Sequence, residues 1–279
     1  MLRHHMLPAL SLLIGSAMYL CLSGCGLLPE QIDETRDWSA DRFYTEAKEA
    51  IDEGSYQTAI GYLEKLQARY PFGRYAQQAQ LTLIYAYYKD NEPDAAIAAA
   101  DRFIRTNPRN PFVDYAYYLK GLVNYTRGEN ALSRLAPTDP AKTDTDSTRQ
   151  AFNDFAELVQ KFPNSNYAED ARQRMQFLHN QLAAYEINVA DYYLQRGAYV
   201  AAVNRAQYVL ENYARTPSVP NALAIMAKAY VKLELPDLAA DSFRVLALNY
   251  PDSPHIPELT ALLNGQEYEE PFSLFGVSF

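Results

Sequence analysis

The sequence predicts an all-α fold in which pairs of helices stack one after another as an α-solenoid. Helix-favouring residues dominate from about residue 40 onward, and apolar residues recur three and four positions apart. Proline returns at roughly repeating intervals along the same region, at Pro71, Pro108, Pro163, Pro217 and Pro251. A small residue precedes four of these prolines by twelve positions, namely Ala59, Ala96, Ala151 and Ala239.

Each interval has the same internal order of helix, turn, helix and proline. The turn comes before the alanine, as at Gly54 and Gly197, and larger apolar residues follow the alanine by four and seven positions. A small side chain lets two helices approach closely, and the proline ends the second helix. This pattern resembles the tetratricopeptide repeat, a unit of about 34 residues whose apolar stripe is buried only by stacking on its neighbours. An ordinary helical bundle is the alternative.

Five repeats are predicted in order, over residues 40–73, 77–110, 114–165, 167–216 and 220–253 of a solenoid spanning 39–264. The third repeat contains an insert, residues 129–146, whose prolines and Thr/Asp run indicate a loop. Ser147 then begins a capping-box pattern that restarts the helix. The first helix of the fourth repeat is either one long helix or two joined helices. A short helix over 256–264 precedes the tail, residues 265–279.

The N-terminus resembles a bacterial lipoprotein signal. Arg3 and a mostly apolar run are followed by Leu-Ser-Gly directly before Cys25. We expect cleavage of residues 1–24, acylation of the Cys25 thiol with fatty acids such as palmitate, and a tether over residues 25–38. An ordinary secretory signal and a short anchor helix are the alternatives. Gly26 gives no retention signal for the inner membrane, which favours the periplasmic face of the outer membrane of a Gram-negative bacterium.

Composition and motifs argue against several functions. The net charge of −9 disfavours nucleic-acid binding, which needs cationic neutralisation of phosphates. Lipidation of Cys25 and removal of Cys21 with the signal would leave no thiol for a disulfide or a metal. His179 and His255 lack ligand-spaced partners, and no nucleophile, metalloprotease or phosphate-loop motif occurs. We therefore expect no enzyme activity, no metal site and no cofactor apart from the covalent lipid.

Tyrosine is abundant, with 23 residues against a single tryptophan. Helical periodicity places one set on the free face of the first helices of the repeats, where it would line a groove for an extended peptide. The alternative is that these rings belong to the core. The predicted set is Tyr44, Tyr85, Tyr88, Tyr115, Tyr118 and Tyr125, flanked by Lys48, Leu81 and Leu122.

Two long segments, Arg69–Lys89 and Asp101–Tyr115, resemble the BamD/ComL lipoprotein family of the outer-membrane β-barrel assembly (BAM) machine. So do Phe162–Ser165 and Tyr192–Arg205. The resemblance implies a scaffold that joins the POTRA-bearing barrel subunit to smaller lipoproteins and to unfolded barrel clients. It also implies that C-terminal repeats dock on a POTRA domain. Arg196, Asn204 and Arg205 are then interface candidates, with Arg205 paired to a carboxylate. The alternative is that Arg205 bonds within its own repeat.

The sequence also suggests a role for the tail and two alternative functions for the chain. Residues 271–279 are apolar and aromatic like the end of a barrel client, so the tail is a candidate internal competitor for the groove. Disorder and packing on the last repeat are the alternatives. A periplasmic repeat lipoprotein of peptidoglycan or cell-envelope maintenance is the second function, and a wall hydrolase with clustered carboxylates is the third.

Overall fold

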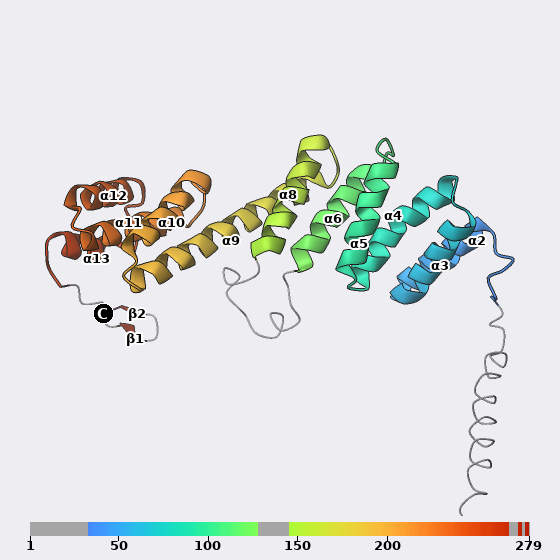
Figure 1. Cartoon of the computed structure of the whole chain (residues 1–279), viewed down its shortest axis with the longest axis horizontal. Helices are drawn as coiled ribbons and strands as arrows, with labels where there is room; N and C mark the ends of the chain where they lie inside the picture. Colours follow the sequence, from blue (N-terminus) through green and yellow to red (C-terminus); the bar gives the residue numbers. More distant parts are fainter. Residues whose placement is uncertain (1–32, 128–144, 268–272, 275–276, 279) are drawn as a thin grey trace, which may run out of the picture. The chain divides into compact units, whose positions relative to one another are not determined.

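The computed structural model describes residues 33–127, 145–267, 273–274 and 277–278 (Figure 1). The chain divides into two compact units, Met1–Ser39 and Ala40–Phe279. The described part of the first unit is a short turn, in which the Asp33 carboxylate accepts hydrogen bonds from the backbone and hydroxyl groups of Thr35. The second unit contains every described helix and the cores that these helices share.

Ten helices of the second unit form five consecutive pairs (Figure 1). The pairs are α2 (Ala40–Asp52) with α3 (Tyr56–Arg69), α4 (Arg74–Lys89) with α5 (Pro93–Thr106), α6 (Val113–Arg127) with α8 (Thr145–Lys161), α9 (Ala168–Gln195) with α10 (Tyr199–Asn212), and α11 (Val219–Lys232) with α12 (Pro236–Asn249). Each helix packs on the next, and α2, α4 and α6 also touch in turn, as do α9 and α11. This order confirms the predicted solenoid of five tetratricopeptide-type pairs.

The alanines of the repeat pattern lie where the helices approach most closely. Ala59, Ala96, Ala151 and Ala239 are fully buried, which fits the need for a small side chain between paired helices. Most of the large apolar residues that follow them in the pattern, such as Phe155, are fully buried as well, whereas Phe243 is half-buried. Burial of each such side chain contributes about 1.5–3 kcal/mol, so stacking supplies most of the stability of each pair.

The turns within the first, second, fourth and fifth pairs share one backbone conformation. Gly54 and Gly197 have φ angles of 77° and 75°, and Asn91 and Glu234 stand at the corresponding positions with φ angles of 62° and 60°. Glycine adopts this left-handed conformation without cost, and asparagine tolerates it better than most residues. The turn at Glu234 is therefore the one built from the least suitable residue.

Several predicted boundaries differ from the observed ones. The second repeat begins at Arg74, three residues before the predicted start at 77, because the chain enters the helix directly after Gly73 at φ 96°. Helix α8 begins at Thr145, so the predicted insert 129–146 is wrong at its end. Ser147 is buried inside the helix and is not its N-cap. Asp146 in the first turn suits the positive end of the helix dipole. The remainder of the insert lies outside the described residues.

The first helix of the fourth pair is continuous. Helix α9 is 28 residues long and belongs to two apolar cores. Leu178 closes the core shared with α4, α5, α6 and α8, and Leu182 opens the core shared with α10 and α11. This one helix therefore links these two hydrophobic clusters.

After α12, the regular structure of the unit consists of one short helix and two short strands. Helix α13 (Ile256–Leu263) packs on α11 and α12, and Gly265 follows it at φ 69°. Beyond it, β1 (Ser273–Leu274) pairs antiparallel with β2 (Val277–Ser278), with Ser273 opposite Ser278. The rest of the predicted tail segment 271–279 lies outside the described residues. In the part of the chain that the structure describes, no helix combines the length and the apolar character needed to cross a membrane.

Candidate functional site

The six predicted tyrosines, hereafter the tyrosine face, lie on the first helices of the first three pairs. Tyr44 comes from α2, Tyr85 and Tyr88 come from α4, and the remaining three come from α6. All six side chains are half-buried. None is fully buried in the core and none is fully exposed, so each ring is held by neighbours and still presents part of its surface.

Tyr118 is the most firmly held member of the tyrosine face. Its hydroxyl group donates a hydrogen bond of 2.7 Å to the Asp170 carboxylate on α9. Its ring stacks on Tyr167 at 4.8 Å between centroids, and Tyr115 meets the same ring at 5.1 Å. Stacked and tilted ring pairs add about 0.5–1.5 kcal/mol beyond area burial. The tyrosine face therefore continues from α6 onto the start of α9.

Helix α9 adds a cation to this surface. The Arg174 guanidinium lies 4.8 Å from the centre of the Tyr125 ring, and its Nε atom is 2.6 Å from the Asp170 carboxylate. Phe177 lies 6.2 Å from Tyr125. Sequence reasoning missed these α9 residues, although Tyr167, Asp170, Arg174 and Phe177 follow the same spacing of three and four that selected the tyrosines.

Burial and neighbouring groups act on the pKa of two phenols of the tyrosine face, Tyr115 and Tyr118. Burial and then the neighbouring phenols raise the pKa of Tyr115 to about 12. Burial and the hydrogen bond to Asp170 raise the pKa of Tyr118 to about 12. Burial acts to raise the pKa of Asp170, but the hydrogen bonds from Arg174 and Tyr118 outweigh it and the pKa is lowered. At neutral pH the site thus holds protonated phenols that can bond peptide groups.

At the N-terminal end of the tyrosine face, Tyr44 on α2 contacts two residues of α4. The Tyr44 and Thr82 hydroxyl groups lie 3.3 Å apart, and the Tyr44 ring is 5.8 Å from Tyr75. Of the predicted flanking residues, Lys48 is exposed, whereas Leu81 and Leu122 are half-buried against the core. The tyrosine face thus has apolar edges at Leu81 and Leu122 and an exposed cation, Lys48, beside it.

The three predicted partner residues lie on the fourth pair. Arg196 is exposed at the end of α9, with its guanidinium 5.2 Å from the Tyr192 ring, and Asn204 is exposed on α10. Arg205 forms an ion pair of 3.0 Å with Glu186 on α9. The Glu186 side chain is 7% exposed and the Arg205 side chain is 46% exposed, so the carboxylate depends on this arginine more than the reverse. Arg205 therefore bonds within its own repeat.

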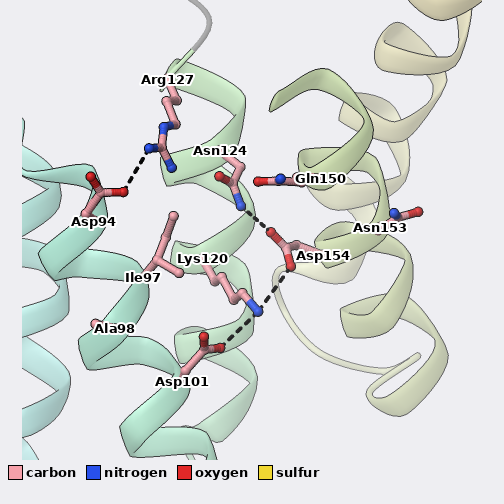
Figure 2. Close-up of a pocket in the computed structure, with 10 residues that line it drawn as sticks. All are labelled: Asp94, Ile97, Ala98, Asp101, Lys120, Asn124, Arg127, Gln150, Asn153 and Asp154. Atoms are coloured by element: carbon pink, nitrogen blue, oxygen red, sulfur yellow. Dashed lines mark hydrogen bonds and ion pairs between the residues drawn. The ribbon is translucent and has the colours of Figure 1, made fainter. Parts of the chain in front are cut away.

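A second candidate site is a polar hollow of about 550 Å³ between α5, α6 and α8 (Figure 2). Lys120 bridges Asp101 at 2.9 Å and Asp154 at 3.4 Å, and the Asn124 amide donates to Asp154. Burial raises the pKa of Asp154 against the lowering effect of Asn124 and Lys120. The remaining residues that line the hollow are Asp94, Ile97, Ala98, Arg127, Gln150 and Asn153. The carboxylates and cations bond one another, so the hollow serves as a polar brace between the second and third pairs.

The histidines and carboxylates of the described residues do not gather into a further site. Among residues 33–127 and 145–267, no three histidine, cysteine or carboxylate side chains come together as a metal site would require. His179 packs between the rings of Phe152 and Tyr213, and His255 bonds Asn221. Cys25 lies outside the described residues.

Fold and surface together define the class: a helical-repeat protein with an aromatic face. The family model described as outer membrane lipoprotein (YfiO) matches residues 36–246, and the chain belongs to this family. A relative from Neisseria meningitidis serogroup B, named outer membrane protein assembly factor BamD, is 45% identical over 250 residues, which cover 88% of this chain and 94% of the relative. A Vibrio cholerae relative of the same name is 39% identical, with coverages of 82% and 93%. These names describe assembly factors, in agreement with the prediction that the chain is not an enzyme.

The solved structures that the chain matches are much more distant in sequence. The crystal structure of MamA protein is 15% identical with a TM-score of 0.36, and the match covers 75% of this chain and 90% of MamA. A tetratricopeptide repeat protein from Parabacteroides merdae is 14% identical with a TM-score of 0.38, covering 81% and 74% of the two chains.

Proposed function

We propose that this chain is a non-enzymatic assembly factor for outer-membrane proteins. The observation that carries the proposal is the 45% identity, over 250 residues, to a relative that bears this name. We further propose that the chain binds the POTRA-bearing barrel subunit, smaller lipoproteins of the same complex and unfolded β-barrel clients. A lipid on Cys25 would hold it at the periplasmic face of the outer membrane, as the signal pattern predicts.

The tyrosine face supports client binding. Its rings are partly exposed and rigidly held, so little side-chain entropy is lost when a segment binds. Protonated phenols can donate to the peptide carbonyl groups of an extended chain. An unfolded β-barrel strand, with alternating apolar and aromatic side chains, has the chemistry that such a face would accept.

Client binding is tested at Tyr85 and Tyr88, the two members of the tyrosine face that lie on α4. We expect the double variant Tyr85→Ala/Tyr88→Ala to weaken binding of a peptide copied from a terminal strand of an outer-membrane barrel by tenfold or more, because anchoring aromatics each contribute about 1–2 kcal/mol. The control is Tyr192→Ala, which removes a 53% exposed tyrosine elsewhere. Equal affinity in the double variant and the wild type, with helix content kept, would defeat this part of the proposal.

The POTRA interface needs a test that separates partner contact from internal support. Arg205→Ala removes the arginine and also leaves the buried Glu186 unpaired. Glu186→Gln removes the internal ion pair but keeps the arginine. If Arg205 contacts the partner, binding of the purified POTRA domains falls in the first variant and persists in the second. Retained binding in Arg205→Ala, or equal losses in both, would rule out the interface role.

Partners and location are tested together in the native membrane. A C-terminally tagged chain, extracted in mild detergent, is expected to copurify with a POTRA-bearing barrel protein and small lipoproteins. Recovery of peptidoglycan-associated or division proteins in their place would instead support the role in envelope maintenance. The variant Cys25→Ser is expected to leave the outer-membrane fraction, since the acyl chains supply the anchor.

A further inference from the structure

Two neighbouring turns each present a phenylalanine to solvent. Phe72 lies between α3 and α4 and is 89% exposed, and Phe112 lies between α5 and α6 and is 61% exposed. Phenylalanine is among the residues most often buried, and a single exposed ring needs no explanation. Two such rings, in the two consecutive connections that link one helix pair to the next, form a pattern.

Hydrogen bonds hold the two turns beside each other. The Asn110 amide in the second turn donates to the Gln77 side chain in the first turn of α4 at 3.1 Å. The Gln77 backbone in turn donates to Gly73, the residue after Phe72. Asn107 donates in the same way to Gln80 at 2.9 Å. The turns therefore make one continuous edge of the solenoid.

This edge is positively charged in a chain that carries a net charge of −9. Arginines stand beside both phenylalanines, and no carboxylate occurs within residues 66–77 or 102–113. The five arginines of these two segments are Arg69, Arg74, Arg102, Arg105 and Arg109. Arg69 covers the Phe43 ring, and Arg74 bonds the Tyr75 hydroxyl group. Within the described residues, Arg105 and Arg109 form no ion pair.

Asp41, Asp101 and Asp114 flank the edge, and each has a partner within the protein, which for Asp101 is Lys120 at 2.9 Å. Asp41 accepts from the Tyr75 hydroxyl group, and Asp114 accepts from the Ser165 hydroxyl group at 2.6 Å. The five arginines outnumber these carboxylates, so the edge keeps an excess of positive charge that can attract an anionic surface.

We propose that this edge, defined by Phe72, Phe112, Arg74, Arg105 and Arg109, rests on a bilayer surface that contains anionic phospholipid. Phenylalanine rings favour the boundary between headgroups and acyl chains, and guanidinium groups bind phosphate in a bidentate manner. Each arginine near such a surface contributes roughly a fivefold gain in binding. The contact is additional to the proposed client and POTRA interactions and shares no residue with the tyrosine face.

The predicted lipid anchor favours a bilayer over an acidic protein as the occupant. Acylation at Cys25 would leave only residues 26–39 between the membrane and α2. A fully extended chain covers at most about 3.6 Å per residue, so the edge would meet the membrane surface at high effective concentration. A weak interfacial contact then suffices to orient the solenoid.

The test uses residues 26–279, which include the whole compact unit Ala40–Phe279. Flotation with vesicles at low salt is expected to show binding to phosphatidylcholine mixed with phosphatidylglycerol and little binding to phosphatidylcholine alone. Phe72→Ser/Phe112→Ser is expected to lower the partition coefficient at least tenfold. Arg105→Gln/Arg109→Gln is expected to lower it about 25-fold. All four positions are exposed, so circular dichroism should show an unchanged fold.

Matched controls remove the same chemistry from another part of the chain. Leu248 is 76% exposed on α12, and Arg215 is exposed after α10. Leu248→Ser and Arg215→Gln are expected to float like the wild type. The proposal is overturned if the wild type fails to float with anionic vesicles at low salt, if the controls lose as much binding as the edge variants, or if the edge binds polyglutamate and not vesicles.

Discussion

The Tyr118 hydroxyl group on α6 donates a 2.7 Å hydrogen bond to the Asp170 carboxylate on α9, across 52 residues of sequence. The bond joins the first helix of the third pair to the first helix of the fourth. Arg174 lies 2.6 Å from the same carboxylate, so Asp170 is shared between a phenol and a guanidinium. This relationship extends the tyrosine face over three pairs onto a fourth.

Tyr118→Phe removes the hydroxyl group and keeps the ring stack with Tyr167. We expect the free energy of unfolding, measured by urea titration, to fall by about 1 kcal/mol, the usual net value of a hydrogen bond. The loss stays modest because Arg174 still neutralises Asp170. Tyr88→Phe is the matched control, since Tyr88 has no hydrogen-bond partner among the described residues. The same loss in both variants would contradict the role assigned to the Tyr118–Asp170 bond.

Gly121 on α6 is required by the ring that packs against it. A Cβ atom at this position would lie 2.5 Å from Cε1 of Phe155, a fully buried residue. We expect Gly121→Ala to cost about 1–3 kcal/mol of stability through overpacking. Gly61→Ala on α3 meets nothing within 4 Å and should gain up to about 1 kcal/mol from helix propensity.

Rescue distinguishes a clash from a backbone effect at Gly121. Replacing Phe155 by the smaller leucine in the double variant Gly121→Ala/Phe155→Leu should recover part of the stability lost in Gly121→Ala alone, measured against Phe155→Leu. Additive losses would show that the ring is not the cause.

The sequence was sufficient to predict the order of the pairs because one physical constraint repeats along it. An alanine such as Ala59 must lie where two helices touch, and a proline must follow where the second helix ends. The start of α8 was predicted incorrectly because two neighbouring positions, Thr145 and Ser147, could each begin the helix. Ser147 with Gln150 has the pattern of a capping box, yet the helix already begins at Thr145.

The sequence was sufficient to predict which tyrosines share one face of a helix, but not which residues of other helices they contact. The 3.6-residue period places Tyr115, Tyr118 and Tyr125 on one side of α6. Their partners on α9 lie about 50 residues away, and the pairing depends on how two pairs stack across the insert. Likewise, the spacing of 19 residues between Glu186 and Arg205 spans a turn, so periodicity within one helix says nothing about their contact.

Lys120 is the cation that supports the buried carboxylate of Asp154 in the polar hollow. Lys120→Met leaves Asp154 with the Asn124 amide alone, and we expect a loss of about 3 kcal/mol at pH 7, typical of breaking a buried pair. Burial already raises the Asp154 pKa, and loss of the cation raises it further. A carboxyl group with a raised folded pKa destabilises the fold as pH rises through that pKa, so the loss should shrink in acid.

Urea titrations of Lys120→Met and the wild type at pH 7 and near pH 4 measure this change. Adding Asp154→Asn to Lys120→Met removes the uncompensated charge and should restore stability at pH 7. A loss that is constant with pH, or no rescue by asparagine, would count against the assigned role of Lys120.

His255 makes the contact between α11 and α13 sensitive to mild acid. Its Nε2 atom lies 2.9 Å from the Asn221 side-chain oxygen. The neutral ring donates a hydrogen bond from Nε2–H to this oxygen. Burial and then Lys228 lower the His255 pKa, against an opposing effect of Glu258. Because the unfolded chain takes up the proton first, stability should fall as pH drops below about 6.5 toward the lowered pKa.

Asn221→Asp sets a carboxylate beside the ring and should raise the His255 pKa. The slope of unfolding free energy against pH should therefore flatten or reverse in this variant, while His255→Gln should only flatten it; unchanged slopes in both would exclude His255 as the origin of the acid sensitivity.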